Sequence, residues 1–424
     1  MPIADLQAPK RWALNGGPFG SKLVSRDYVD TGVPVIRGAN LPNDRRFSHD
    51  DLVFVSEEKA DELLANNAHP GDVVFTQRGT LGQVGIIPIN SPYRRYVISQ
   101  SQMKLTVDES RVDALWLFYC FRNPTTQQEM INRASSSGVP HINLGVLREF
   151  RIRLPSLPEQ RRIASILSAY DDLIENNTRR IAILEEMARR IYEEWFVRLR
   201  FPGHEGVRMV ESELGLVPAG WTIEAVEAVT ETLGGGTPSK TESDYWDGGD
   251  INWYSPTDLT SAKTVFMEES ASKITELGLA KSSAKLFPPN SVMMTSRATL
   301  GVIAVNTTPA CTNQGFIVCV PSDRLPLWLL FHWLKANESE FEGLATGATF
   351  KEITKGVFRK IKLAVPAKPT ATAFEGVVGP MMDLVLRLER KNRNLRTTRD
   401  LLLPKLISGE LDVSALPEPE ALAA

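Results

Sequence analysis

The sequence of 424 residues is 42% hydrophobic and 23% charged, and its formal net charge is -3 at pH 7. This length exceeds that of one ordinary hydrophobic core, so we expect two or three domains. The composition is not that of a disordered or a membrane-embedded chain. The slightly acidic balance also excludes a polycation that coats DNA by bulk charge, because such binding rests on many lysine and arginine contacts to phosphate. Any binding of nucleic acid is therefore expected to be local or shared with a partner.

The three cysteines, Cys120, Cys311 and Cys319, form no CxxC pair and have no histidine at zinc spacing. We therefore expect neither a disulfide framework nor a structural metal, which fits a reducing cytoplasm. The first residues, MPIADLQAPKRWAL, lack the basic-then-apolar pattern of a signal peptide, and the most apolar stretch, Leu325 to Leu334, is too short to cross a bilayer. A cytoplasmic protein without a membrane segment is expected.

The first domain is expected to cover residues 1–154. Short strands such as VPVIRGANL and DVVFTQRG carry alternating apolar residues and are broken by glycine, proline and asparagine, which is typical of a compact α+β domain. Helices are predicted at Ser56–Asn66, Leu115–Arg122 and near Leu144–Phe150. The segment GGPFGSKL, from Gly16 to Leu23, lacks the GxxxxGKS or GxxxxGKT order of a phosphate-binding loop, so we expect a glycine turn.

A long helix is predicted from Pro158 to about Phe196, within a first spacer region at residues 155–200. Its apolar positions alternate steps of four and three residues, which is typical of a coiled-coil seam. The seam positions are Ile163, Leu167, Tyr170, Ile174, Asn177, Ile181, Leu184, Ala188, Ile191 and Trp195. The alternative is an amphipathic helix that packs only on its own domain.

The second domain, expected at residues 201–365, repeats the first in the same order. The segment from Pro70 to Ile86 matches that from Pro289 to Val305, and GGPFGSKL matches GGGTPSK, another expected glycine turn. Four further pairs are VPVIRGANL with INWYSPTDL, ISQSQMKLTV with CTNQGFIVCV, ALWLFYCFRN with PLWLLFHWLK, and RIRLPSLPEQ with KIKLAVPAKP. Subtracting the position of Pro155 from that of Pro366 gives an offset of 211 residues. Solenoid repeats are much shorter, at roughly 20 to 50 residues, so a whole domain and its following helix are duplicated.

A second long helix is predicted from about Thr370 to Leu406, within a final region at residues 366–424. Its seam has the same period and consists of Phe374, Val378, Met381, Val385, Leu388, Asn392, Leu395, Arg399, Leu402 and Leu406. Gly379-Pro380 interrupts this seam. Because proline removes an internal hydrogen bond and clashes with the preceding turn, we expect a kink or a helix that begins near Pro380.

One asparagine in each seam predicts how the two helices pack. Parallel packing would bury Asn177 and Asn392 against apolar residues, and an unpaired buried amide costs about 1 to 3 kcal/mol. Antiparallel packing sets the two asparagines against each other and Tyr170 against Arg399, which would form a cation–π pair or a solvated edge. A helix of some 33 residues is about 50 Å long, more than one turn of B-DNA at roughly 34 Å. We therefore predict an antiparallel coiled coil, with the two domains at opposite ends about an approximate two-fold axis.

The segments LPSLPEQRRIASILSAYDDLIE, from Leu154 to Glu175, and LLLPKLISGELDV, from Leu401 to Val413, resemble the two conserved helical regions of type I restriction-modification specificity subunits. The repeated domains, with FTQRGTLG and MTSRATLG, resemble the target recognition domains of that family. The resemblance covers nearly the whole chain. It implies a noncatalytic subunit whose two domains bind the halves of a bipartite site in double-stranded DNA, with helices that fix the spacer between them.

The same resemblance implies partners. Two methyltransferase subunits held by the helices would use S-adenosylmethionine to methylate adenine, and motor and nuclease restriction subunits would use ATP and magnesium. This chain itself would need no cofactor. The residues agree that it is not the methyltransferase, because it lacks an Asn/Asp-Pro-Pro-aromatic motif: Pro288-Pro289 lies between Phe287 and Asn290.

Candidate DNA contacts are sought in polar loops, because bidentate side chains read base edges while lysine, arginine and hydroxyl groups hold phosphates. In the first domain they are Ser21, Lys22, Arg37, Asn40, Gln77, Arg78, Thr80, Gln100, Gln102 and the loop from Arg133 to Asn143. In the second they are Ser239, Lys240, Tyr254, Thr257, Asp258, Ser296, Arg297, Thr299, Asn313, Gln314 and the segment from Thr346 to Lys351. Arg78 and Arg297 are the strongest candidates, because they occupy equivalent positions in the two repeats. Alternatively, each arginine could be placed there to form a structural salt bridge.

Two arginine pairs, Arg45-Arg46 and Arg94-Arg95, are candidates for phosphate contacts or for plain solvated surface. Two other functions remain open at this point. One is a coiled-coil scaffold that joins two protein-binding domains without contacting DNA, which the acidic net charge mildly favours. The other is a fused enzyme with unrecognised catalytic residues, which the lack of clustered histidine, cysteine or paired carboxylates disfavours.

Overall fold

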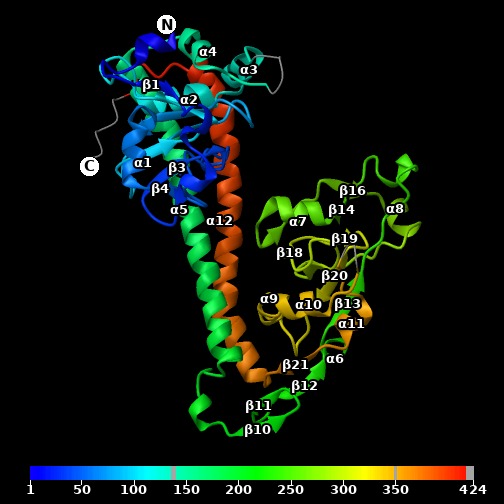
Figure 1. The fold of residues 1–424 in the computed structure, drawn as a ribbon. Coiled ribbons are helices and arrows are strands. Elements are labelled where there is room, and N and C mark those ends of the chain that lie inside the picture. The colour runs from blue at the N-terminus through cyan, green and yellow to red at the C-terminus, as the bar shows by residue number, and fades with distance from the viewer. Residues whose placement is uncertain (135–139, 348–350, 417–424) are drawn as a thin grey trace. The chain divides into compact units, whose positions relative to one another are not determined.

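The computed structural model describes residues 1–134, 140–347 and 351–416 of the chain (Figure 1). The chain forms two compact units, one made of Met1–Thr178 with Lys391–Ala424 and the other of Arg179–Arg390. Two long helices, α5 (Leu157–Tyr192) and α12 (Lys368–Ser408), contribute one part to each unit. Each unit therefore combines one globular domain with segments of both helices. No helix in the described part of the chain is long and apolar enough to cross a membrane.

The first unit contains two sheets. A four-stranded antiparallel sheet has the order β1-β9-β6-β7, and a five-stranded mixed sheet has the order β2-β4-β3-β8-β5, in which β3 and β8 are parallel. The strands are β1 (Leu14–Gly16), β2 (Tyr28–Val29), β3 (Val33–Ile36), β4 (Val53–Val55), β5 (Asn67–Ala68), β6 (Val73–Thr76), β7 (Val84–Ile86), β8 (Tyr96–Ile98) and β9 (Gln102–Leu105).

Strand β6 shows why these strands are apolar along their whole length. Val73 and Phe75 belong to a core shared with the helices, whereas Val74 belongs to a separate core with Ile36 and Ile98 of the other sheet. Successive side chains of a strand point to opposite faces, so both faces of β6 are covered. The four-stranded sheet is thus the middle layer of the first domain.

The described part of the first domain also contains four short helices: α1 (Glu57–Glu62), α2 (Ala114–Arg122), α3 (Pro124–Asn132) and α4 (Leu144–Glu149). The side chain of Ser56 caps α1, and that of Asp113 accepts from the Trp116 N–H at 2.8 Å to cap α2. The helices predicted near residues 115 and 144 are confirmed. The helix predicted at Ser56–Asn66 is shorter, because a 3-10 turn at Leu64–Asn66 follows α1.

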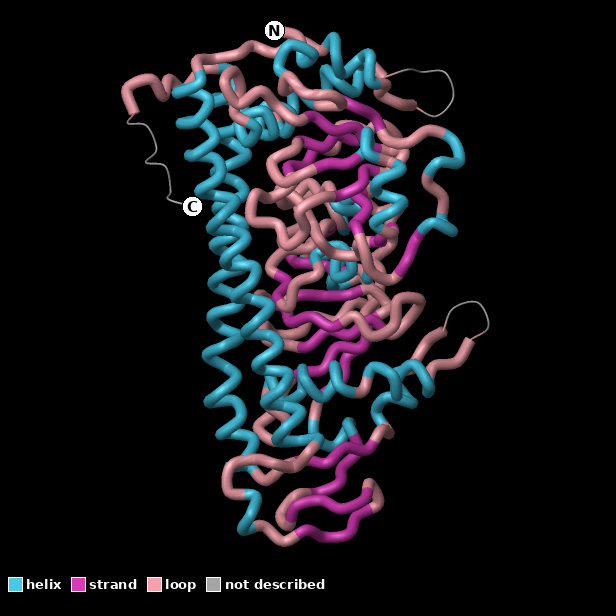
Figure 2. Tube along the Cα trace, turned by 60° about the vertical axis from the view of Figure 1, so that its left-hand side comes forward, coloured by secondary structure: helices cyan, strands magenta, loops and turns pink. Residues whose placement is uncertain are grey.

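The second unit repeats both sheets of the first (Figure 2). The order β13-β20-β17-β18, extended by β15, matches β1-β9-β6-β7, and β16-β14-β19 matches β4-β3-β8, including its parallel pair. The strands are β10 (Met209–Ser212), β11 (Gly215–Pro218), β12 (Thr222–Ala225), β13 (Glu231–Gly234), β14 (Ile251–Tyr254), β15 (Phe266–Met267), β16 (Ser272–Ile274), β17 (Val292–Thr295), β18 (Ile303–Asn306), β19 (Ala310–Thr312), β20 (Phe316–Val320) and β21 (Lys362–Val365). The duplication and the α+β class are therefore confirmed.

The second domain has six short helices of its own within the described residues: α6 (Val226–Val229), α7 (Pro256–Ala262), α8 (Glu276–Ala280), α9 (Leu327–Ala336), α10 (Glu338–Leu344) and α11 (Lys355–Arg359). Helix α9 is buried on every side from Trp328 to Leu334, as α2 is from Trp116 to Phe121. A helix that is apolar all round belongs in the core. Both domains are thus built around an equivalent buried helix.

The paired helices confirm the antiparallel prediction. In the first unit the Asn177 Nδ2 donates to the Asn392 Oδ1 at 2.9 Å, and both residues are buried. Further along in the same unit, Asp171 lies opposite Arg399. Residue numbers therefore decrease along α5 in the direction in which they increase along α12, and the two helices are antiparallel. Within each unit the segments of α5 and α12 lie side by side (Figures 1 and 2). The two seam amides bond to each other, as the energy of burying them requires.

Two details of the long helices correct the sequence prediction. Helix α12 begins at Lys368 and continues through Pro380, so a helix that begins near Pro380 is wrong. Pro380 and Gly376 are both exposed, and water can therefore solvate the Gly376 carbonyl group that loses its hydrogen bond. The other helix, α5, ends in a π-helical turn at Glu193–Val197, which accounts for its predicted end near residue 196.

Candidate nucleic-acid interface

The loop after β6 carries Arg78 and is fixed by backbone hydrogen bonds on both sides. The N–H groups of Gln77 and Arg78 donate to the Ser101 carbonyl oxygen at 2.7 and 3.3 Å. On the other side the Ile142 N–H donates to the Gln77 carbonyl oxygen at 3.0 Å, and Arg78 forms an isolated β-bridge with His141. The backbone therefore holds Arg78 in place while its side chain is exposed.

The second unit builds the same loop around Arg297, after β17. The Ser296 N–H donates to the Gly315 carbonyl oxygen at 2.8 Å, and the Ile353 N–H donates to the Ser296 carbonyl oxygen at 3.0 Å. Arg297 forms an isolated β-bridge with Glu352, just as its counterpart does in the first unit. The two arginines thus occupy equivalent positions, as the repeat predicts.

Both guanidinium groups are available to an outside anion. Among the residues that the structure describes, no carboxylate pairs with Arg78. The Glu352 carboxylate lies 3.9 Å from the Arg297 guanidinium, and these side chains are 40% and 50% exposed. An ion pair this exposed contributes about 0 to 1 kcal/mol. Within the described residues, the salt bridge that could have explained both arginines is therefore missing from one loop and weak in the other.

The glycine turns lie against the chain that leaves the parallel strand pair. A Cβ atom on Gly17 would lie 2.0 Å from the Ser99 carbonyl oxygen, and one on Gly235 would lie 2.0 Å from the Asn313 carbonyl oxygen. Only glycine permits so close an approach of two backbones. The predicted turn is present in the first segment, as a 3-10 turn at Gly20–Lys22, whereas the second segment continues as irregular chain from Gly235 to Ser239.

Equivalent glutamines join each glycine turn to the neighbouring arginine loop. In the first unit the Gln100 Nε2 donates to the carbonyl oxygens of Gly20 at 2.5 Å and Leu23 at 3.1 Å. In the second, the Thr237 Oγ1 donates to the Gln314 Oε1 at 2.8 Å. Glycine turn, glutamine and arginine loop are therefore contiguous in each unit.

The strand register corrects one pairing made from sequence. Ile36 pairs with Ile98, and Tyr254, at the position of Ile36, pairs with Thr312. Ile98 therefore corresponds to Thr312 and not to Cys311, so the match of ISQSQMKLTV with CTNQGFIVCV is wrong by one residue. A shift of one residue in a strand exchanges its two faces. In the corrected alignment Gln100 of the first unit and Gln314 of the second occupy equivalent positions.

Most of the sequence candidates are exposed in the structure. They are Ser21, Lys22, Arg78, Thr80, Gln100, Arg133, Asn143, Ser239, Lys240, Thr257, Arg297, Thr299, Gln314 and Lys351. Asn143 also caps α4 by accepting from the Val146 N–H at 2.9 Å, and Arg133 pairs with Glu129 at 2.6 Å. Residues 135–139 and 348–350 of the two candidate loops lie outside the described residues. Contact with DNA stays a prediction for this exposed set.

The structure corrects five candidates, because their side chains are buried: Asn40, Gln77, Gln102, Tyr254 and Ser296. The Asn40 Nδ2 donates to the carbonyl oxygens of Ser48 at 3.2 Å and Asp50 at 3.0 Å, so it stabilises its own turn. Tyr254 lies in a core cluster, and burial raises the pKa of its hydroxyl group. These side chains are not available to a duplex.

Three half-buried candidates have structural contacts. The Arg37 Nη2 donates to the Asp51 carbonyl oxygen at 2.5 Å. The Asp258 Oδ2 accepts from the Ser255 N–H at 2.8 Å at the start of α7. The Asn313 Oδ1 accepts from the Gly315 N–H at 2.8 Å in the turn before β20. Each of these side chains shapes a loop of the candidate surface.

In each of the two arginine pairs, Arg45-Arg46 and Arg94-Arg95, one arginine makes structural ion pairs and the other is exposed. Arg46 pairs with Asp172 at 2.5 Å and with Glu175 at 3.1 Å on α5, and Arg95 pairs with Asp61 at 2.6 Å. Arg46 and Arg95 therefore make structural ion pairs, which neither alternative, phosphate contact or plain solvated surface, had predicted. Arg45, which pairs with Asp50, and Arg94 are exposed.

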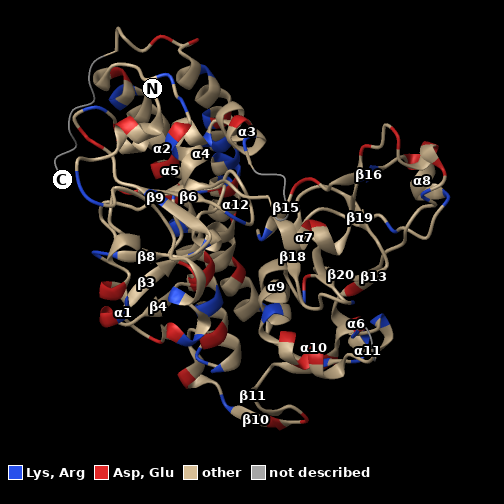
Figure 3. Cartoon of the chain, turned by 45° about the horizontal axis from the view of Figure 1, so that its top comes forward, with Lys and Arg blue, Asp and Glu red and all other residues tan. Residues whose placement is uncertain are grey.

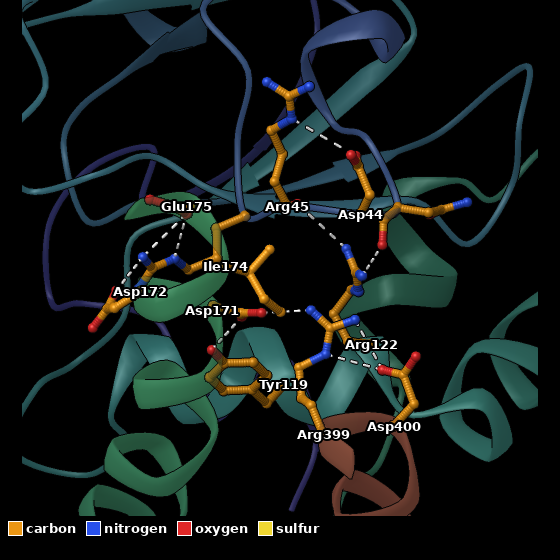
Figure 4. A network of polar contacts seen from close by, with 12 residues as sticks. Asp44, Arg45, Tyr119, Arg122, Asp171, Asp172, Ile174, Glu175, Arg399 and Asp400 are labelled. Carbon is orange, nitrogen blue, oxygen red and sulfur yellow. Dashed lines mark hydrogen bonds and ion pairs between the residues drawn. The ribbon is translucent and has the colours of Figure 1, made fainter. Parts of the chain in front are cut away.

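A buried polar network holds the first domain on its helices (Figure 4). Asp171 of α5 accepts from the Tyr119 hydroxyl group at 2.6 Å and from the Arg399 Nη1 at 2.5 Å. The side chains of Asp171 and Arg399 are only 5% and 7% exposed. Burial, together with Asp171, raises the pKa of Tyr119. Arg399 thus faces Asp171, which corrects the predicted contact with Tyr170.

The charge of the molecule agrees with a local interface. Lysine and arginine alternate with aspartate and glutamate in both units, so neither domain is covered by one sign (Figure 3). In the second unit a hollow of about 350 Å³ lies beside the arginine loop, lined by Pro256, Arg297, Ala298, Asn313, Gln314 and Gly315. Arginine and amide groups that line a hollow are suited to reading the edges of bases.

Each unit of this chain combines a duplicated α+β domain, which carries a fixed and exposed arginine loop, with segments of the same two long helices. Residues 18–186 and 218–372 match the family model described as the type I restriction modification DNA specificity domain. The chain belongs to this family.

Individual relatives agree. The HindI specificity subunit of Haemophilus influenzae is 23% identical over 401 residues, which cover 80% of this chain and 86% of that protein. The MjaIX specificity subunit of Methanocaldococcus jannaschii is 29% identical over 187 residues, and this match spans only 43% of that protein. A crystal structure of the S subunit of a type I restriction-modification system from M. genitalium shares the fold, with a TM-score of 0.62 at 15% identity over 96% of this chain and 95% of that one.

Proposed function

We propose that this chain is the noncatalytic DNA-recognition subunit of a type I restriction-modification complex and that each unit reads one half of a bipartite site in double-stranded DNA. The observation that carries this proposal is the pair of exposed arginines, Arg78 and Arg297, held by the same backbone contacts in duplicated domains. Arginine at such a place binds guanine or phosphate. Duplication of the site fits a target with two halves.

The antiparallel helix pair supports a fixed spacing between the half-sites. Its amide pair and its buried ion pair each specify one register of α5 on α12 in the first unit. A fixed register would set a constant number of unread base pairs between the halves. The helices would also hold two methyltransferase subunits, which use S-adenosylmethionine, and the motor and nuclease subunits would bring ATP and magnesium. We propose that this complex works in the cytoplasm.

The slightly acidic net charge fits a subunit that binds DNA as part of a complex. Sequence-independent affinity comes from many phosphate contacts, and partners can supply these. Within the described residues no group of histidine, cysteine and carboxylate side chains could hold a metal ion. We assign the chemistry of methylation to the partners because the sequence lacks the Asn/Asp-Pro-Pro-aromatic motif of an amino-methyltransferase.

The proposal is tested by expressing the chain with its methyltransferase in a host without other adenine methylation and mapping methylated adenines by sequencing. We expect one interrupted motif with a methyl group on each strand. Omission of this chain, with the methyltransferase still present, is the control and should abolish the pattern. If the complete complex neither methylates nor retains a bipartite duplex, the scaffold function takes the place of DNA recognition.

A further inference from the structure

The glycine turn of the first unit presents an aromatic side chain to solvent. Phe19 is 74% exposed, and it lies between Gly17 and Gly20 of this turn. Removing an aromatic ring from water is favourable, so such exposure is unfavourable unless something covers the ring. Single exposed apolar residues are common on protein surfaces, and the position of Phe19 must therefore decide its role.

Phe19 belongs to a segment that is bonded to the same stretch of chain, Ser99 to Ser101, as the arginine loop. The close contact of Gly17 with the Ser99 carbonyl oxygen fixes the start of the turn, and Gln100 fixes Gly20 through a hydrogen bond of 2.5 Å. The residue after Gln100 is Ser101, whose carbonyl oxygen accepts from the Arg78 N–H. The aromatic ring is thus carried by a backbone that is tied directly to the candidate DNA-reading loop.

The second unit has different chemistry at this place. Thr237 occupies the position of Phe19, two residues after the glycine that touches the neighbouring backbone. Its hydroxyl group donates to Gln314, which lines the hollow beside Arg297. The first unit therefore presents an apolar ring where the second has a hydroxyl group bound to an amide. Such a difference within a shared frame is expected of a position that reads different base pairs in the two halves.

We propose that Phe19 reads the first half-site by packing its ring against the methyl group of a thymine in the major groove. This inference rests on the proposed DNA recognition. Phenylalanine contacts to the thymine methyl group are one of the direct readout modes, and Arg78 in the adjoining loop is the side-chain type that reads guanine in the same groove. Gln100 would hold the turn in place through its bonds to Gly20 and Leu23, while Phe19 and Arg78 read neighbouring base pairs.

The test measures binding of the full chain, in complex with its methyltransferase, to a duplex that contains the mapped site. Each thymine of both half-sites is replaced in turn by deoxyuridine, which lacks only the 5-methyl group. For the wild-type chain we expect one replacement, in one half-site, to weaken binding about four-fold, which corresponds to one buried methyl group at about 0.8 kcal/mol. Phe19→Ala should weaken binding to the thymine duplex at least as much and should no longer respond to that replacement.

Three variants serve as controls. Phe19→Leu keeps an apolar contact and should retain most of the response, whereas Phe19→Thr copies the second unit and should lose it. Ile89→Ala removes a side chain that is equally exposed, at 79%, but packs beside Gly71 at the start of β6 and not at its end. This change should leave both affinity and thymine response unchanged. All variants should unfold like the wild type, since the altered side chains are exposed.

The outcomes separate this inference from the proposed function. If Phe19→Ala binds as the wild type does while the complex still recognises its bipartite site, the role of Phe19 is overturned and DNA recognition stands. If Phe19→Ala weakens binding but no thymine replacement does, the ring acts as a wedge between bases and the thymine assignment is wrong. If the complex recognises no bipartite site, the proposed function itself fails.

Discussion

The two units connect their central buried helix to a long helix by different polar contacts. In the first, the Gln160 Oε1 of α5 accepts from the Asp113 N–H at 2.9 Å, and Asp113 itself caps α2. In the second, Pro326 stands at the cap position without a side-chain cap, and Glu375 of α12 accepts from two N–H groups in the first turn of α9 at 2.9 Å. The duplicated fold thus keeps the connection while the residues that make it change.

The largest difference is the buried charge in the first unit. The positions equivalent to Asp171 and Arg399, displaced by 211 residues in sequence, are Met382 and Ala188, which belong to the apolar core of the second unit. Arg399→Ala leaves Asp171 buried without its partner and should reduce the free energy of unfolding by about 3 to 5 kcal/mol. Urea unfolding followed by circular dichroism measures this loss.

The second unit supplies the matched control for that change. Arg399→Ala combined with Asp171→Met copies the apolar pair and should recover most of the lost stability, because hydrophobic replacement of a buried ion pair is often neutral or better. A double variant no more stable than Arg399→Ala alone would show that the network has another role.

Acid should destabilise the second unit through a buried histidine that the first unit lacks. His332 of α9 is buried among aromatic rings, and burial lowers its pKa to about 4. Cys120 holds the equivalent position in α2. Because the unfolded chain binds this proton more tightly, stability should fall as the pH drops from about 6.5 to 4, by about 3 kcal/mol at most.

His332→Cys copies the first unit and should remove this part of the pH dependence. The measurement is thermal unfolding of both proteins from pH 7 to pH 4.5, in which the carboxylates common to the two proteins cancel in the comparison. Parallel curves for the two proteins would mean that His332 does not carry the acid response.

The asparagine layer distinguishes the helix segments of the two units. The sequence positions equivalent to Asn177 and Asn392 are Leu388 and Ile181. Asn177→Leu alone should cost about 1 to 3 kcal/mol, since it leaves the amide of Asn392 buried with fewer partners. Asn177→Leu with Asn392→Leu should recover that loss in the same unfolding experiment. Equal, additive losses in this double-mutant cycle would contradict the pairing.

The smallest expected effect concerns the helix cap. Glu375→Ala removes the acceptor for the first turn of α9 and should destabilise the second unit by about 1 kcal/mol, the usual worth of a cap. Glu375→Gln retains an acceptor oxygen and should lose less. Hydrogen exchange of the amides at 328 and 329 reports on this turn directly, and unchanged exchange in Glu375→Ala would show that the contact does not stabilise the cap.

Period and repeat made the main architecture predictable. The alternating four and three steps placed Asn177 against Asn392, because the register of two antiparallel helices follows from their ends and their period. The repeat likewise placed Arg78 and Arg297 at equivalent points. The predicted seam is wrong by one residue where a charge is buried. Asp171 faces Arg399 in place of the neighbouring Tyr170, and the Tyr119 hydroxyl group completes the hydrogen bonding of the Asp171 carboxylate.

Burial of single side chains was harder to predict, because polar residue types alone do not show which way a strand faces. Its polar hydroxyl group predicts a surface position for Tyr254, although the repeat places this residue at the position of Ile36, which is a core residue. The same comparison could have identified Phe19, since a phenylalanine in a glycine turn stands where the other unit has Thr237. Structural context was needed to show that its ring is exposed.

The most direct test of two-site recognition compares Arg78→Ala with Arg297→Ala in the complex with the methyltransferase. Affinity is measured for the mapped duplex and for duplexes with base changes in one half-site at a time. Each variant should lose about 1 to 3 kcal/mol of discrimination in one half-site, a different one for each arginine, and keep it in the other. Loss spread equally over both halves, or no loss for either variant, would contradict the account of two independent reading domains.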